Sequence, residues 1–288
     1  MRPVLSELLE LLRLERIEEN LFRGPSQDLG WGQVFGGQVL GQALSAAEQT
    51  VPDGRFVHSL HGYFLRTGDA RRPIVYTVDP IRDGRSFTTR RVVAVQGGKA
   101  IFNLAASFQR EEPGFEHQDT LPEGVPDPET LKSESQLARR LEGIIPDALY
   151  ERAIAERPIE IRPVDPSNPM APDVRAPSHQ VWFRASDPLP DARSVHHYLL
   201  AYASDFSFLT TAMRPHGVSW LTPGMQVASL DHAMWFHRPF RFDDWLLYDM
   251  RSPSASNARG LVQGRIFDRS GALVATVAQE GLMRDRRA

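Results

Sequence analysis

The sequence VFGGQVLGQALSAAEQT (residues 34–50) decides the fold, because it has the length of a helix together with small side chains and little charge. Such low charge is typical of a helix that is buried rather than one that lies on the surface. Small residues also let a helix approach a sheet closely, and this stretch contains Gly36, Gly37, Gly41, Ala43, Ala46 and Ala47. We therefore predict a central, mostly buried helix over residues 34–50.

Strand patterns follow this helix directly. Three long runs predict strands over Val57–Arg66, Ile74–Ile81 and Ser86–Gln96. The third run turns at Gly97-Gly98 into a fourth, Ala100–Gln109. One long helix followed by a meander of antiparallel strands is an α+β pattern. A curved sheet wrapped around a central helix is the hotdog arrangement, which we expect here.

The second half of the chain repeats this order. Tyr76 and Tyr248 occupy matching strands, as do Val95 and Phe267, and both pairs lie 172 positions apart (248 − 76 and 267 − 95). Equal offsets indicate an internal duplication, so we predict two tandem hotdog repeats with their sheets edge to edge. Two unrelated α+β domains are the alternative. The elements predicted for this half are strands at Ile159–Val164 and Gln180–Arg184, a helix at Arg193–Phe206, and strands at Met225–Arg238, Trp245–Arg251, Arg259–Asp268 and Leu273–Met283.

A proline-rich stretch separates the two halves. Eleven of the 22 prolines lie between residues 111 and 178, and proline at that density interrupts regular structure. One helix, Glu129–Ile145, is predicted there because leucines and isoleucines recur at helical spacing before Pro146. The predicted organisation is an N-terminal hotdog domain (1–110), a connector with a helix (111–156) and a C-terminal hotdog domain (157–288).

The composition argues against several classes of function. The 288 residues carry 33 basic and 36 acidic side chains without a basic stripe, so nucleic acid is not an expected partner. The absence of cysteine excludes disulfides and thiolate metal sites. Charges interrupt the leucines of Val4–Ile17, which predicts an amphipathic surface helix rather than a signal peptide. Because no apolar run approaches the ~20 residues that cross a bilayer, we expect a cytoplasmic protein.

Common catalytic and cofactor motifs are missing. No Gly-x-Ser-x-Gly elbow occurs, so an α/β-hydrolase serine is not supported. No Gly-x-x-x-x-Gly-Lys phosphate loop occurs either, and Gly36-Gly37-x-x-x-Gly41 has the wrong spacing for a dinucleotide fingerprint, so no cofactor is expected. The strand histidine pairs His58 and His61, and His232 and His237, are spaced so that their members face opposite sides. Structural or surface roles are therefore favoured, and no metal site is expected. His58 stays open as a functional residue because it begins a central strand.

Three polar residues of the second half stand in apolar surroundings, and structural roles are open for each. Asp205 ends the predicted apolar helix, which is the unfavourable end of a helix dipole for a carboxylate. Ser229 begins a strand, and strand alternation places it with Asp231 on the face opposite His232. Gln279 lies in a largely apolar strand, where a buried amide needs partners for both its oxygen and its nitrogen.

Six blocks, in order over nearly the whole chain, resemble the type II acyl-CoA thioesterase family, whose members have a double hotdog fold. In the first half these blocks are LFRG (21–24), QVFGGQV (33–39) and VHSLHGYFLR (57–66). In the second half they are VHHYLLAYASD (195–205), LDHAMWFHRPF (230–240) and QEGLMR (279–284). A single block is weak, but the six together are specific.

The resemblance implies hydrolysis of fatty acyl-CoA to free fatty acid and CoA. The family's catalytic set of an aspartate, a threonine or serine, and a glutamine falls on Asp205, Ser229 and Gln279. In this role Asp205 takes a proton from the attacking water as general base, and the other two residues hold that water. Several relatives have threonine at position 229, and serine lacks the methyl that restricts χ1. A covalent serine nucleophile is the alternative mechanism.

Further residues are expected to bind the substrate. A backbone N–H near Gly36 and Gly37 would stabilise the oxyanion. The offset of 172 matches Gln279 with Ser107, so the first half lacks the catalytic set and we predict one site per chain. Guanidinium groups suit phosphate oxygens, and the candidates for contacts with the CoA phosphates are Arg90, Arg91 and Arg259.

Two other functions stay open. A hotdog enoyl-CoA hydratase or dehydratase needs an acid and a base across two adjacent carbons, and His58 is the candidate for one of them. A non-catalytic acyl-CoA-binding module needs no such groups. By analogy with other hotdog proteins, we expect a homo-oligomer, either a dimer or a tetramer.

Overall fold

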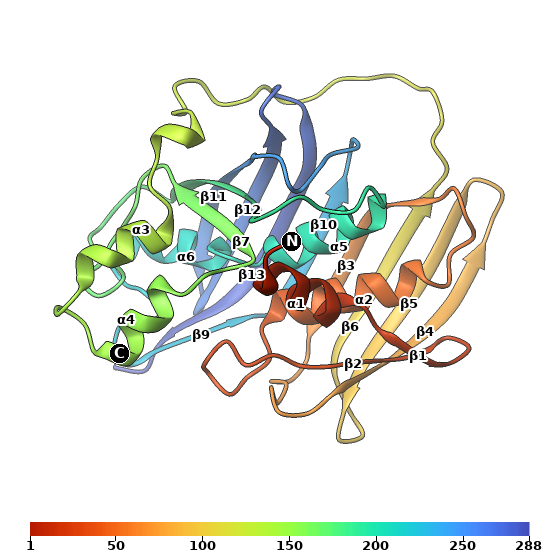
Figure 1. The fold of residues 1–288 in the computed structure, drawn as a ribbon, viewed down its shortest axis with the longest axis horizontal. Coiled ribbons are helices and arrows are strands. Elements are labelled where there is room, and N and C mark those ends of the chain that lie inside the picture. Colours follow the sequence, from red (N-terminus) through yellow and green to blue (C-terminus); the bar gives the residue numbers. More distant parts are fainter. Residues whose placement is uncertain (288) are drawn as a thin grey trace.

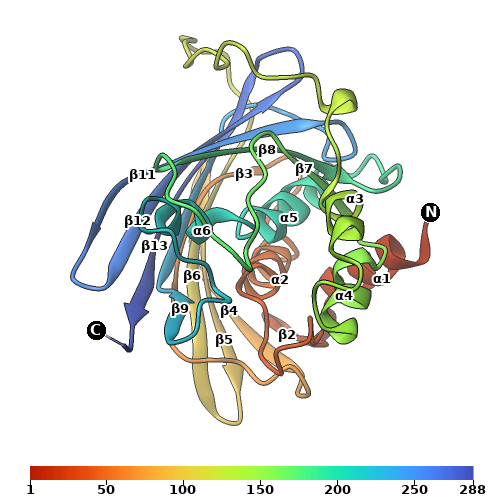
Figure 2. The same ribbon diagram turned by 90° about the vertical axis from the view of Figure 1, so that its left-hand side faces the viewer.

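A single antiparallel sheet of 13 strands runs through the molecule in the computed structural model, which describes residues 1–287 (Figure 1). The two long central helices lie on one face of this sheet (Figure 2). Among residues 1–287, no helix has both the length and the apolar character needed to cross a membrane.

The first half contributes six strands. The elements are α1 (Pro3–Leu12), β1 (Glu15–Glu18), β2 (Leu21–Gly24), α2 (Gly36–Glu48), β3 (Phe56–Phe64), β4 (Ile74–Asp83), β5 (Phe87–Gln96) and β6 (Lys99–Gln109). The predicted central helix and the four strands that follow it agree with these bounds to within two residues at each end. The predicted helix Val4–Ile17 is too long, because the chain leaves the helix at Arg13 and enters β1.

The second half contributes seven strands. The elements are β7 (Ile159–Pro163), β8 (Ser178–Ala185), α5 (Arg193–Ala203), α6 (Phe208–Met213), β9 (Met225–Ser229), β10 (Asp231–Phe236), β11 (Leu246–Ser256), β12 (Arg259–Asp268) and β13 (Leu273–Asp285). The predicted strand Met225–Arg238 is divided at Leu230 into β9 and β10, and α6 was not predicted at all.

The order of strands has an internal symmetry. The sheet runs β1-β2-β4-β5-β6-β3-β10-β13-β12-β11-β8-β7, with β9 pairing β13 outside this path. Read outward from the central pair β3 and β10, the strands of one half correspond one by one to those of the other. At the centre, Leu60 of β3 lies opposite Met234 of β10. The α+β double hotdog fold is confirmed.

The glycines of α2 allow this helix to pack closely against α5. A Cβ atom at Gly37 would lie 2.2 Å from the carbonyl oxygen of Tyr202, and one at Gly41 would lie 2.9 Å from that of Tyr198. Both are backbone atoms, so only glycine lets the two helices come this close. The sequence-based explanation, close approach of this helix to a sheet, was therefore incomplete: the glycines face the other central helix.

The connector is more irregular than predicted. In place of one helix over Glu129–Ile145, it forms α3 (Glu134–Ala138), flanked by 3-10 turns at Pro128–Thr130 and Arg139–Leu141. A further helix, α4 (Asp147–Ile154), begins after Pro146. Figure 1 shows the preceding segment running from the end of β6 across to the second half. There it covers Trp182 and Trp245 with an apolar cluster that includes Leu121, Val125 and Leu131.

Candidate active site

Asp205, Ser229 and Gln279 form a chain of hydrogen bonds. Ser229 Oγ donates to Asp205 Oδ1 over 3.2 Å, and Gln279 Nε2 donates to Ser229 Oγ over 2.7 Å. Asp205 lies in the turn after α5, Ser229 ends β9, and Gln279 lies within β13. Gln279 is buried, whereas Asp205 and Ser229 are partly exposed. The chain therefore leads from the interior to groups that a substrate can reach.

A bulge at Leu230 directs Ser229 into this chain. Between the pairs Ser229–Gly281 and Ala233–Ala278, one strand advances four residues while β13 advances three. An extra residue of this kind reverses the alternation of side chains, and such bulges occur often beside active sites. The prediction that Ser229 and His232 face opposite sides is therefore wrong, since both side chains reach Gln279.

His232 extends the chain into the core. Its Nδ1 lies 2.5 Å from Gln279 Oε1 and its Nε2 lies 2.9 Å from Ser204 Oγ. The ring is fully buried, and burial lowers the pKa of His232 although the nearby Asp205 carboxylate opposes this shift. Sequence reasoning assigned His232 a structural role. Its only signal was a polar residue among apolar ones on an alternating strand.

The N-terminus of α2 faces Asp205. A Cβ atom at Gly36 would lie 2.6 Å from Asp205 Oδ2, so glycine is needed for this approach. The first amides of a helix have no intrahelical partner and carry partial positive charge, and no side chain caps α2 at Phe35. Asp205 thus lies at the unfavourable end of α5, as predicted, but also at the favourable end of α2. That second contact was not visible in the sequence.

Aromatic side chains from both halves surround this junction. Phe35 stacks on Phe206 with ring centroids 4.5 Å apart, and it meets Tyr202 edge-on at 5.3 Å. The ring of Phe64, at the end of β3, lies 3.2 Å from the Cβ position of Gly36. The polar trio comes from the second half, while the first half supplies the helix N-terminus and part of the apolar wall.

The three arginines predicted to contact CoA phosphates lie elsewhere. Arg90 is buried, and its guanidinium donates to Thr50 Oγ1, to the Thr50 carbonyl and to Asp83 Oδ1. Because further bonds to backbone carbonyls use its remaining donors, Arg90 is not available to a phosphate and that prediction is wrong. Arg91 and Arg259, paired with carboxylates of Asp79 and Glu280, point to the face of the sheet opposite Gln279 by strand alternation. A role for either in binding phosphate stays a prediction.

His58 does not join the trio. Its Nε2 lies 2.8 Å from Ser107 Oγ, and burial lowers the pKa of the imidazole. The Phe64 amide, which donates to the Leu230 carbonyl beside Ser229, is six residues further along β3. At the rise of a strand this separates His58 from Ser229 by about 20 Å. His58 is therefore too far from the trio to take part in the chemistry there, and a role for it in binding substrate stays a prediction.

Strand register also corrects the match between Gln279 and Ser107. The pairs lead from Tyr76 through Ala94 to Phe102, and from Tyr248 through Ile266 to Ala275. Phe102 therefore matches Ala275, and four residues further on Ala106 matches Gln279. The partner of Ala106 on β3 is Leu60, which matches His232. At these two positions the first half is apolar.

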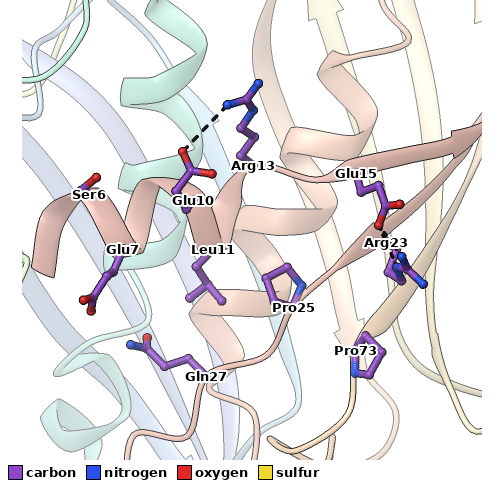
Figure 3. A pocket seen from close by; sticks show the side chains of 10 residues that line it. All are labelled: Ser6, Glu7, Glu10, Leu11, Arg13, Glu15, Arg23, Pro25, Gln27 and Pro73. Carbon is purple, nitrogen blue, oxygen red and sulfur yellow. Dashed lines mark hydrogen bonds and ion pairs between the residues drawn. The ribbon is translucent and has the colours of Figure 1, made fainter. Parts of the chain in front are cut away.

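An open groove on another part of the surface contains none of these residues. It lies beside α1, β1 and β2 (Figure 3). Its volume is about 810 Å³. Glu7, Glu10 and Arg13 are among the residues that line it. Among residues 1–287, no three His, Asp or Glu side chains are grouped so that they would hold a metal ion.

Comparisons with known proteins identify the family. The family models described as acyl-CoA thioesterase and acyl-CoA thioesterase N-terminal domain match residues 149–282 and 25–109. The chain is 45% identical to acyl-CoA thioesterase 2 of Haemophilus influenzae, over 99% of both chains. It is 42% identical to human acyl-coenzyme A thioesterase 8, over 95% of this chain and 88% of that one. The crystal structure of an acyl-CoA thioesterase II from Mycobacterium marinum has 43% identity and a TM-score of 0.76, covering 96% of this chain and 98% of that chain. The chain belongs to the type II acyl-CoA thioesterase family.

Proposed function

We propose that this chain hydrolyses fatty acyl-CoA to free fatty acid and CoA by attack of a water molecule that Asp205, Ser229 and Gln279 activate. The hydrogen-bonded chain of these three side chains is the observation that carries the proposal. Membership of the family and the relatives named as acyl-CoA thioesterases support the reaction class.

The residues suit an uncharged nucleophile. A thioester carbonyl is electrophilic enough for an oriented water to attack it directly. Asp205 takes one proton from that water, while Ser229 and Gln279 orient its oxygen toward the carbonyl carbon. The new C–O bond forms, the C–S bond breaks, and the proton passes to the thiolate of CoA. The amides of Gly36 and Gly37 are the proposed donors to the oxyanion.

A covalent serine intermediate has less support. A serine nucleophile is usually activated by a neighbouring base such as histidine. Within residues 1–287 the partners of Ser229 Oγ are Asp205 and Gln279, and His232 contacts Gln279 instead. Rapid acid quenching during turnover, followed by mass spectrometry of the protein, separates the two routes, because only the serine route places an acyl group on the protein. We expect no acyl group on Ser229 in the quenched protein.

Substitution of the proposed base tests the function. Thiol release from decanoyl-CoA is followed for the wild type and for Asp205→Asn, with trans-decenoyl-CoA as a second substrate to detect hydration. We expect kcat to fall about 10³-fold in Asp205→Asn, since the general base is lost. Asp191→Asn, at an exposed aspartate paired with Arg241, is the matched control and keeps its activity.

Two results would contradict the proposal. Thiol release no faster than in buffer would exclude the thioesterase activity, and full activity of Asp205→Asn would exclude Asp205 as the base. Loss of the enoyl absorbance without thiol release would instead identify a hydratase. Since His58, the candidate acid or base of a hydratase, lies away from the trio, we expect hydrolysis alone.

The domain limits, the oligomeric state and the location of the protein are also proposals. We propose that the domain limits lie near residues 110 and 157, at the two ends of the connector. A homo-oligomer and a cytoplasmic location are predictions from the sequence. Light scattering after size-exclusion chromatography tests the first, and fractionation of the source cells tests the second.

A further inference from the structure

We infer that His232 is a positioning residue that fixes the orientation of the Gln279 amide. The inference rests on the proposed function, because Gln279 is one of the three residues assigned to the reaction. It concerns the buried His232, for which the sequence favoured a structural or surface role.

The five polar groups can be satisfied in a single direction. The proton of Ser204 Oγ has two acceptors at 2.9 Å, the Ala201 carbonyl and His232 Nε2. With that proton on the side of His232, His232 Nδ1–H donates to Gln279 Oε1, and Gln279 Nε2 donates to Ser229 Oγ. Ser229 in turn donates to the Asp205 carboxylate. Each group has the donor or acceptor that its neighbour needs, and the series ends on an anion that can only accept. In this arrangement His232 is neutral and protonated on Nδ1.

If the hydrogen bonds ran in the opposite direction, one of the two contacts of Ser229 Oγ would have no proton. If the amide of Gln279 were turned over, its oxygen would face Ser229 Oγ over 2.7 Å, while the Asp205 carboxylate faces the same hydroxyl over 3.2 Å. Ser229 has one proton and could serve only one of these two acceptors. The other pair of oxygens would repel, at a distance where an unmet polar contact is costly. The contacts of Ser229 therefore favour the first direction.

The surroundings of His232 hold it in place. The ring is fully buried, with the ring of Phe208 6.0 Å away and the sulfur of Met234 in contact with Ser204 Oγ. Tyr248 donates its hydroxyl to the carbonyl of Ser204 over 3.1 Å. Neither Ser204 nor His232 touches the exposed end of the chain. His232 acts on the reaction through Gln279, whose amide nitrogen has Ser229 Oγ as its acceptor within residues 1–287.

Two amide substitutions at position 232 test this role. The side-chain nitrogen of asparagine falls near Nδ1 of histidine, whereas that of the longer glutamine falls near Nε2. We expect His232→Asn to keep a donor to Gln279 and to retain kcat within about threefold of wild type. His232→Gln loses that donor and leaves Gln279 free to turn over, so we expect kcat to fall about 10²-fold, with KM changing less than threefold. Melting temperatures of both variants show whether the fold survives.

The outcomes separate this inference from the proposed function. Suppose that Asp205→Asn is inactive, while His232→Asn and His232→Gln either both lose kcat equally or both keep it. His232 is then structural, so this inference is wrong while the proposed function stands. If Asp205→Asn is fully active, the proposed function fails first. The tautomer gives a readout independent of activity: ¹⁵N NMR of histidine-labelled protein should show His232 protonated on Nδ1. Protonation on Nε2 would overturn the inference even with active enzyme.

Discussion

Ser229 is held by two partners, yet as a serine it has more freedom than a threonine at the same position. Threonine keeps the hydroxyl and adds a methyl that restricts χ1. We expect Ser229→Thr to keep kcat within about threefold of wild type, and Ser229→Ala to lower it about 10²-fold because the water loses one of its holders. Steady-state thiol release from decanoyl-CoA measures both. Equal activity of the alanine variant and the wild type would show that the hydroxyl is not needed.

Gly36 determines how closely Asp205 approaches α2. In Gly36→Ala the new Cβ would lie 2.6 Å from Asp205 Oδ2 and 3.2 Å from the ring of Phe64, so the carboxylate must move. We expect kcat to fall about 10²-fold, since a displaced base loses its alignment with the water. The melting temperature should change little, because alanine favours a helix over glycine and the displaced atom belongs to a side chain. Unchanged kcat would show that Asp205 tolerates the shift.

Some residues of this site can be predicted from the sequence, and others cannot. Asp205, Ser229 and Gln279 were predicted because six blocks resemble a known family, and individually none stood out. His232 was missed because a histidine on an apolar strand is indistinguishable from a satisfied core residue until its partners are seen. Arg90 was wrongly assigned because its burial depends on Thr50 and Asp83, which lie on neighbouring segments.

At the scale of elements, helix and strand periods predicted most of the sheet, but local irregularities had to be seen. The bulge at Leu230 inserts one residue into the strand without changing its composition, so the alternation of polar and apolar residues does not predict it. The helix α6 was missed because it has only six residues, Phe208–Met213. It packs over Gly260, Gly264 and Gly281 of the second half, where Ala212, Phe208 and Leu209 occupy the space above the glycines.

The contact between α2 and α5 should be sensitive to a single methyl group. In Gly37→Ala the new Cβ would lie 2.2 Å from the backbone oxygen of Tyr202, which cannot rotate away. The two helices must then separate, and we expect the free energy of unfolding to fall by about 1–3 kcal/mol. Urea unfolding measures this, with Gln49→Ala at the exposed end of the same helix as control. A variant as stable as wild type would show that the helices move apart without cost.

The fold of the molecule is duplicated, but the proposed active site is present in the second half alone. The two halves match strand by strand, and Tyr76 and Tyr248 each reach a central helix with their hydroxyls. At the positions that correspond to His232 and Gln279, however, the first half has Leu60 and Ala106. The first half therefore keeps the packing and contributes α2 and its aromatic wall to the other half's site. This asymmetry supports the prediction of one site per chain.

The free energy of unfolding should fall in acid partly because of His179 in β8, which is not part of the trio. Burial lowers the pKa of this imidazole to about 4, and the charges of Arg214 and Arg175 add to the shift while Asp165 opposes it. Its Nδ1 is buried and has no hydrogen-bond partner within residues 1–287. Because the unfolded chain binds this proton near pH 6.5, the contribution is full above that value and is lost as pH falls toward 4.

Replacing this histidine should therefore flatten the dependence of stability on pH. Between pH 7.5 and pH 4.5 we expect wild type to lose about 2 kcal/mol more than His179→Gln, after allowing for the partial exposure of the ring. Urea unfolding of both proteins at four pH values gives the difference, in which the carboxylates that titrate over the same range cancel. Parallel curves would mean that His179 takes up its proton in the folded protein as readily as in the unfolded chain.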